Sequence, residues 1–205
     1  MIPARLIRTI PEHPSDEAER FWSLGCTLHP SWDHVTYQDP IDPAWFPITS
    51  PFWPRCQSGA QKAGLIRLEA LYGSGGIYID SDVELYRSLE PLRGGPGFGL
   101  WEDENTVPDF VLGAEPEHPA IWACLTMAID RIQSDSADWR TGNGAWATGP
   151  GVATTVLPGR DDFLLLPPAS FAPYHYSQPE RATENHAAIP YSFGAHHWHH
   201  SWAGH

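Results

Sequence analysis

A helix, a glycine-rich turn, a short apolar strand and two carboxylates follow one another in the middle of the chain. The segment SGAQKAGLIRLEALY (58–72) repeats apolar residues at helical spacing, and the glycine-rich segment 73–76 ends the helix. The strand IYID (77–80) then leads into Asp80 and Asp82. On an extended chain, residues two apart share one face. The order therefore predicts two carboxylates at the carboxyl edge of a sheet, where α/β folds bind their ligands.

Two carboxylates on one face repel each other, and no Lys or Arg lies close to this pair in the sequence. A hard divalent cation neutralises such a pair. The same cation can hold a diphosphate and stabilise charge on a departing oxygen. An Asp-x-Asp triplet alone is more often a solvated loop, so its context decides the interpretation.

The order of elements along the chain predicts one α/β domain with a mixed central sheet flanked by helices. The length of 205 residues suits a single domain. Helices are expected near 15–28, 58–72 and from Pro119 onward. The expected strands are 2–10, 35–39, 77–80, 97–101, 110–114 and 162–168, the last of them buried. Residues 40–54 and 145–155 are expected to be loops, the second running into a helix.

Composition excludes some classes of partner. The net charge of −13 argues against binding a nucleic-acid backbone or an anionic membrane surface. The three cysteines are widely spaced and odd in number, which favours free thiols in a reducing compartment. Neither a signal peptide nor an integral membrane segment is recognisable. A cytoplasmic protein is expected.

Residues 60–92 resemble the DXD-motif sugar-binding glycosyltransferases, a family that includes initiating mannosyltransferases and capsular polysaccharide transferases. The residues that carry the resemblance are Arg67, Leu71, Tyr72, Gly75, Gly76, Tyr78, Asp80 and Asp82. The turn Thr148-Gly149-Pro150 and the C-terminal residues 196–202 are also similar to the family pattern.

The resemblance implies a GT-A fold, with residues 1–95 as the nucleotide-sugar-binding half and 96–205 as the acceptor side. It implies a retaining transfer, and Asp80, Arg67 and Tyr78 at the donor. Asp80 and Asp82 would hold Mn²⁺ or Mg²⁺. The family usually has Asp where this chain has Gly64, a difference that concerns the identity of the donor.

The C-terminal segment holds five histidines within ten residues, at positions 196, 197, 199, 200 and 205. Neutral imidazole is a good ligand for manganese-class metals. From its place in the family-like pattern, His196 is the predicted third metal ligand. Ser201 and Trp202 are predicted to close over the diphosphate, because hydroxyl and indole N–H groups donate to phosphate oxygens.

A second acidic cluster follows the strand expected at 97–101. Glu102 and Asp103 are predicted to bind acceptor hydroxyls or to stabilise positive charge on the reacting sugar. Asp109, just before the strand at 110–114, is a candidate for positioning or catalysis. A solvated acidic loop is the alternative for this cluster.

The leading hypothesis is a hexosyltransferase that moves a sugar from a UDP- or GDP-linked donor to a glycan, lipid-linked or small-molecule acceptor. Two alternatives remain open: a metal-dependent nucleotide-sugar phosphohydrolase, and a non-catalytic GT-A module that binds sugar. The sequence contains no GxxxxGK[ST], HExxH or GxSxG motif. A P-loop nucleotide site, a zinc-protease site and a serine-hydrolase site are therefore not indicated.

Overall fold

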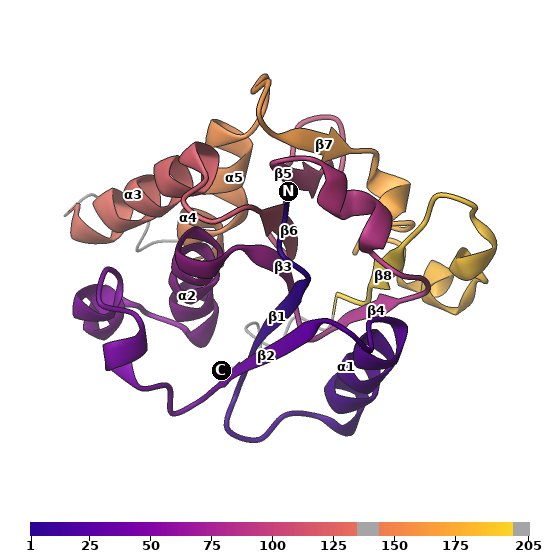
Figure 1. Cartoon of the computed structure of the whole chain (residues 1–205), viewed down its shortest axis with the longest axis horizontal. Coiled ribbons are helices and arrows are strands. Elements are labelled where there is room, and N and C mark those ends of the chain that lie inside the picture. Colours follow the sequence, from indigo (N-terminus) through magenta and orange to yellow (C-terminus); the bar gives the residue numbers. More distant parts are fainter. Residues whose placement is uncertain (135–143, 199–205) are drawn as a thin grey trace.

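The computed structural model describes residues 1–134 and 144–198, which form a mixed α/β domain around a six-stranded sheet (Figure 1). The strand order is β2-β1-β3-β6-β5-β7. The strands are β1 (Arg5–Ile10), β2 (Asp33–Gln38), β3 (Gly76–Ile79), β5 (Gly97–Leu100), β6 (Val111–Ala114) and β7 (Leu164–Leu166). A separate two-stranded sheet pairs β4 (Val83–Leu85) with β8 (Gly194–His196).

The direction of the strands gathers several polar residues at one edge of the large sheet. Strand β1 runs parallel to β2 and β3, and β5 runs parallel to β7, while β6 is antiparallel to both β3 and β5. The carboxyl ends of β1, β3 and β5 therefore lie beside the start of β6. This edge carries Thr9, Asp80, Glu102 and Asp109.

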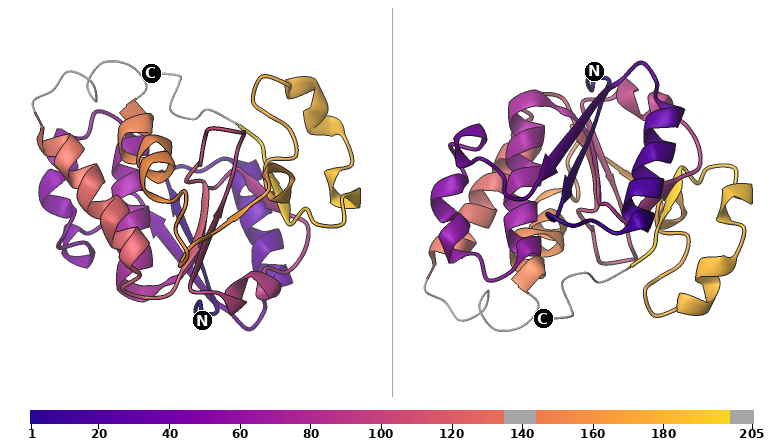
Figure 2. Two further views of the ribbon diagram at one scale, coloured as in Figure 1. Left: turned by 90° about the horizontal axis from the view of Figure 1, so that it is seen from above. Right: turned by 90° about the horizontal axis from the view of Figure 1, so that it is seen from below.

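Helices cover the two faces of the sheet unequally (Figure 2). On one face lie α2 (Gly59–Ser74), α3 (Pro119–Gln133), α4 (Gly144–Thr148) and α5 (Pro150–Val156). On the other lie α1 (Asp16–Leu28), the small sheet and the segment that leads to β8. Short 3₁₀ helices are Pro43–Trp45, Ser50–Arg55, Glu90–Gly94, Pro168–Ser170, Pro179–Thr183 and His186–Ala188.

The core divides along the same two faces. Ile7, Tyr78 and Leu112 point toward α2 and α3 in the larger hydrophobic cluster, whereas Leu6 and Ile77 belong to the second. Adjacent strand residues thus alternate between two cores, as the period of two requires. Tyr78 belongs to the larger cluster through its ring, while its hydroxyl lies at the sheet edge that carries Asp80 and Asp109.

The predicted start and stop of α2 are confirmed. The Ser58 hydroxyl accepts a hydrogen bond from the Gln61 amide at 3.3 Å, an N-cap. At the other end Gly75 has φ of 62°, and a Cβ there would lie 2.7 Å from Pro116. Glycine is needed for both reasons, and the turn delivers β3 directly into the sheet.

Three local expectations are corrected. Asp80 and Asp82 are not on an extended chain, because the Val83 amide donates to the Asp80 carbonyl at 3.1 Å and closes a turn. Residues 145–155 are not a loop but belong to α4 and α5. The buried strand expected at 162–168 is β7, which is only three residues long. Its first residue, Leu164, is exposed because β7 lies at the edge of the sheet.

In the part of the chain that the structure describes, helices reach neither the length nor the apolarity needed to cross a bilayer. The cytoplasmic location stays a prediction.

Candidate donor and metal site

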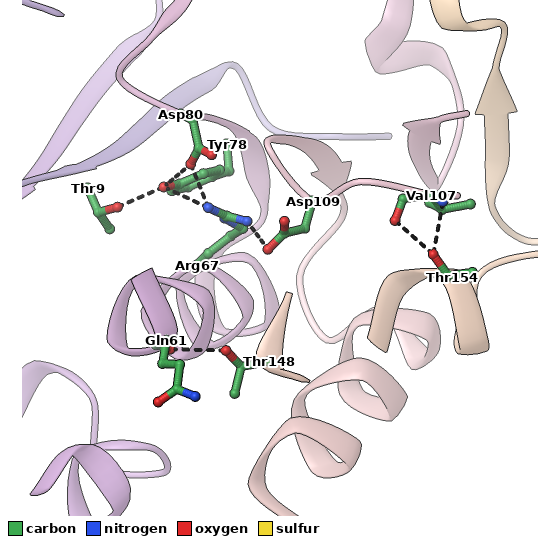
Figure 3. Close-up of polar contacts among 9 residues, drawn as sticks. All are labelled: Thr9, Gln61, Arg67, Tyr78, Asp80, Val107, Asp109, Thr148 and Thr154. Atoms are coloured by element: carbon green, nitrogen blue, oxygen red, sulfur yellow. Dashed lines mark hydrogen bonds and ion pairs between the residues drawn. The ribbon is translucent and has the colours of Figure 1, made fainter. Parts of the chain in front are cut away.

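A buried arginine joins two acids at the centre of the site (Figure 3). Arg67 lies on α2, and its Nη2 is 2.5 Å from Oδ1 of Asp80 at the end of β3. Its Nη1 forms an ion pair with Asp109, which precedes β6. The Arg67 side chain is only 5% exposed and Asp109 14%. Although the sequence near the acidic pair lacks a cation, helix packing supplies one.

Tyr78 extends this network toward β1. Its hydroxyl donates to Asp80 Oδ1 at 2.9 Å, so Thr9 must be the donor in the 2.7 Å bond between their hydroxyls. The Arg67 guanidinium carbon lies 4.4 Å above the Tyr78 ring. The phenol thereby orients both the carboxylate and the guanidinium, a contact that no sequence pattern predicts.

The charged groups of this network shift one another's pKa values. Burial opposes the charge of Arg67, but the carboxylates of Asp109 and Asp80 outweigh it and raise the pKa of the guanidinium further. Burial also raises the pKa of Asp80 to about 6; Arg67 opposes this shift, and the charges of Asp109 and Asp82 add to it. Removing the guanidinium would therefore leave several carboxyl groups crowded in a poorly solvated place.

The small sheet brings His196 to the second aspartate of the motif. Strand β8 pairs with β4 so that His196 lies opposite Val83. The His196 Nε2 is 3.1 Å from Asp82 Oδ1, and its ring stacks on Phe110 with centroids 4.1 Å apart. His197 points elsewhere, to Glu84 at 3.1 Å. Of the two neighbouring histidines, His196 is the one at the motif.

Asp80, Asp82 and His196 fit a divalent metal ion. One ligand atom of each lies within 4.8 Å of the others. The His196 Nδ1 is buried and has no hydrogen-bond partner among the described residues. Two carboxylates and an imidazole form a donor set that suits manganese-class ions. The predicted ligand set is thus brought together, while its role in binding metal stays a prediction.

The two acids of the second cluster, Glu102 and Asp103, differ in exposure and in their contacts. Glu102 is 11% exposed and lies 3.4 Å from Nε2 of His175. Burial raises its pKa to about 7, and the charges of Asp103 and Asp109 contribute. Asp103 is exposed, and its Oδ1 accepts hydrogen bonds from the amides of Asn105 and Thr106. Asp103 thus stabilises the turn, and one ligand atom each of Glu102, Asp103 and His175 lies within 4.8 Å of the others. The catalytic roles of Glu102 and Asp103 stay predictions.

The Thr-Gly-Pro turn packs tightly against this centre. A Cβ at Gly149 would lie 2.7 Å from Asp109 Oδ2, so glycine lets the backbone approach the acid. A Cβ at Gly64 would lie 3.1 Å from both Oγ1 and the carbonyl oxygen of Thr148. The space beside Gly64, where the family usually has Asp, is thus occupied by Thr148.

Some predicted residues lie outside the described part of the chain. These are Ser201 and Trp202, together with the histidines at 199, 200 and 205. Conversely, His175 was missed from the sequence, since a single His in a Pro-containing segment carries no distinguishing signal.

Comparison with known proteins gives consistent matches. Residues 23–98 match the family described as glycosyltransferase sugar-binding region containing DXD motif. Inositol phosphoceramide mannosyltransferase 3 of Schizosaccharomyces pombe is 29% identical over 99 residues, 45% of this chain and 27% of the relative. Mannosyl phosphorylinositol ceramide synthase CSH1 of Saccharomyces cerevisiae is 29% identical over 96 residues, 45% of this chain and 26% of the relative. The chain therefore spans about a quarter of these curated relatives.

Solved structures share the fold. The PaToxG glycosyltransferase superposes with a TM-score of 0.56 at 16% identity, covering 76% of this chain and 69% of that one. A glycosyltransferase involved in glycosylation of the PBCV-1 major capsid gives 0.55 at 13% identity, covering 95% and 94%. The predicted GT-A-type α/β fold is confirmed. The resemblance to the glycosyltransferases with a DXD-containing sugar-binding region is confirmed too, over residues 23–98.

Proposed function

We propose that the chain is a metal-dependent glycosyltransferase that moves a hexose from a UDP- or GDP-linked donor to a hydroxyl acceptor. The observation that carries the proposal is the cluster of Asp80, Asp82 and His196 beside a buried, doubly paired Arg67. In a protein of net charge −13, a divalent cation held by these acids would bridge to the phosphates of the donor. The matches to named glycosyltransferases support the reaction class.

Asp80, Asp82 and His196 would hold the Mn²⁺ or Mg²⁺ ion. When bound, the ion neutralises the diphosphate and stabilises the charge that develops on it as the sugar leaves. The remaining work belongs to side chains that position the donor and the acceptor.

Arg67 acts mainly by positioning. Its guanidinium is buried between Asp80 and Asp109, so it holds both carboxylates at the edge of the sheet. Arg67 and Tyr78 remain donor-side residues in the proposal. They would act on the donor through Asp80, whose carboxylate both side chains hold. Asp109, 14% exposed, would accept a hydrogen bond from the donor sugar.

In the transfer, an acceptor oxygen bonds to the anomeric carbon while the bond from that carbon to the diphosphate oxygen breaks, its electron pair leaving with the diphosphate. The proton of the acceptor hydroxyl passes to the departing diphosphate, as a retaining reaction on one face of the sugar requires. Glu102 accepts a hydrogen bond from the acceptor hydroxyl and orients it. The retaining outcome is an expectation from the family resemblance, tested by the anomeric configuration of the product.

The yeast relatives are named for mannosyl transfer to inositol phosphoceramide. We carry over hexosyl transfer as the reaction, with a glycan, lipid-linked or small-molecule acceptor. A cytoplasmic place of action is part of the same proposal.

The test is turnover of UDP- and GDP-hexoses with Mn²⁺, Mg²⁺ or a chelator, with products identified by mass. We expect a glycoside product only with metal, and a loss of at least about 100-fold in Asp82→Asn. Asp33→Asn is the matched control, because Asp33 is an exposed carboxylate at the start of β2 and pairs with Arg5.

Two results would contradict the proposal. Free sugar released at the full rate of donor consumption, whichever acceptors are supplied, would identify a phosphohydrolase. Donor binding without consumption of any donor would identify a non-catalytic module.

A further inference from the structure

A second group of metal-binding side chains lies at the edge of the sheet. One ligand atom each of Glu102, Asp103 and His175 lies within 4.8 Å of the others, and the group shares no residue with the ligand set at the DXD motif. The two acids follow β5, whereas His175 belongs to the irregular segment after β7. Folding therefore brings together donor atoms that are far apart in the sequence.

This second cluster is built in the same way as the first. Each cluster joins two carboxylates that follow a strand to one histidine from the chain beyond β7. Strands β3 and β5 are both antiparallel to β6, so they deliver their acids to the same edge of the sheet. The Trp198 ring contacts both histidines, with centroids 4.2 Å from His196 and 6.2 Å from His175. The two clusters are therefore neighbours with equivalent donor sets.

The contact between His175 and Glu102 calls for a positive ion. The His175 Nε2 faces Glu102 Oε1 at 3.4 Å, and its Nδ1 lies 2.8 Å from the Ser177 hydroxyl. When Nδ1 donates to that hydroxyl, Nε2 presents a lone pair to the carboxylate, and the two acceptors repel each other unless a cation lies between them. In the other tautomer Nδ1 accepts from the Ser177 amide at 3.3 Å, and a proton on Nε2 fills the gap.

Asp103 favours a metal ion over the proton. Its Oδ1 accepts hydrogen bonds from the amides of Asn105 at 2.7 Å and Thr106 at 2.8 Å. These bonds fix the direction of the carboxylate and lower the pKa of Asp103, so it is charged at neutral pH. A proton is shared by His175 and Glu102 alone, whereas a divalent ion binds all three side chains and neutralises both carboxylates.

We propose that Glu102, Asp103 and His175 form a second divalent-cation site, for a manganese-class ion, separate from the site at the DXD motif. Two carboxylates and one imidazole suit such an ion. An ion of this class takes about six ligands, so three protein ligands leave positions for water or a substrate oxygen. The inference goes beyond the proposed function, which uses one metal ion.

The first experiment counts bound Mn²⁺ in the full chain without nucleotide. The EPR signal of free Mn²⁺ is followed as Mn²⁺ is titrated to millimolar concentration into Asp82→Asn, which lacks a ligand of the first site. We expect one ion per chain, with its affinity lowered at least about tenfold when Glu102→Gln or His175→Ala is added. Glu104→Gln is the matched control, because Glu104 is an exposed acid of the same loop outside the cluster, and it should keep the ion.

The second experiment identifies a ligand of that ion. Electron-spin-echo modulation of Mn²⁺ bound to Asp82→Asn should show a directly bound nitrogen, and labelling the histidines with ¹⁵N should change its frequency. The same modulation should persist when His196→Ala is added, which assigns the nitrogen to His175.

The inference is overturned if Asp82→Asn binds no Mn²⁺, if its ion survives both Glu102→Gln and His175→Ala, or if Glu104→Gln releases it equally. A bound Mn²⁺ without nitrogen coupling would also overturn it. Failure of the proposed function looks different: donor turnover and nucleotide binding are then absent in the wild type, whether or not an ion binds at His175.

Discussion

The proposed donor side and the proposed acceptor side of the site are held together by different interactions. On the donor side, Arg67, Asp80 and Asp109 are charged, mostly buried and paired with one another. On the proposed acceptor side, Glu102 is 11% exposed, and its carboxylate lies 3.4 Å from Nε2 of His175. Removing the charge of Arg67 should therefore cost folding stability, whereas removing the charge of Glu102 should not.

The largest expected effect breaks the donor side. Arg67→Met leaves Asp80 and Asp109 without their cation in a buried place, and should lower the free energy of unfolding by about 3–5 kcal/mol. Urea denaturation at neutral pH in a chelator measures it. Arg160→Met, which removes the cation of a pair with Asp162 that is 28% and 39% exposed, should cost less than about 1 kcal/mol. Equal losses in the two variants would contradict the comparison.

The next largest effect is the pH dependence of stability that Glu102 causes on the proposed acceptor side. Folded Glu102 keeps its proton to about pH 7, whereas its ordinary pKa is 4.5. The folded state therefore binds the extra proton between these values, and stability falls as pH rises through them. Glu102→Gln should remove this loss, giving a gain on the order of 2 kcal/mol at pH 8 and none at pH 4.

The measurement is denaturation at both pH values without metal. A glutamine variant that follows the wild type at both would show that the carboxyl group titrates normally.

A smaller effect separates Asp103 from its neighbour. Because Asp103 accepts two backbone amides in the turn, Asp103→Ala should cost about 1 kcal/mol of stability. Asp103→Asn keeps an acceptor oxygen and should change kcat/KM by less than about threefold. A large loss of kcat in a stably folded Asp103→Asn variant would instead support the catalytic role predicted from the sequence.

The smallest effect tests the close approach between Gly64 on α2 and Thr148. Gly73 has open space around it in α2, so Gly73→Ala should stabilise the fold by about 0.5–1 kcal/mol. Gly64→Ala meets Thr148 at 3.1 Å, which should cancel the same gain. Thermal melts of the two variants measure the difference, and an equal gain would mean that Thr148 moves aside without cost.

The donor side could largely be predicted because its signals are local. The cap at Ser58, the stop at Gly75 and the strand into Asp80 follow one another in one stretch of sequence, and each depends on residues next to it. The resemblance added Arg67 but not its contacts. That Arg67 pairs with Asp80 and Asp109 depends on how α2 packs on the sheet, which no local pattern contains.

The acceptor side could be predicted only in part for the same reason. Glu102 was named from its place after a strand, yet its partner His175 is 73 positions away and belongs to an irregular segment. The sequence does not distinguish Asp103 from Glu102, because both are acids after the same strand; exposure and hydrogen bonding separate them in the structure. His196 was found from the family pattern, while its approach to Asp82 requires the β4–β8 pairing.

The most direct test of the central claim is calorimetric titration of UDP and of GDP, each with and without Mn²⁺. Titrations use the wild type, Asp82→Asn and the control Asp33→Asn. The account predicts that one nucleotide binds only with Mn²⁺, that the binding disappears in Asp82→Asn, and that Asp33→Asn retains it. Binding that needs no metal, or no binding of either nucleotide, would contradict the assignment of Asp80, Asp82 and His196 as the metal and donor site.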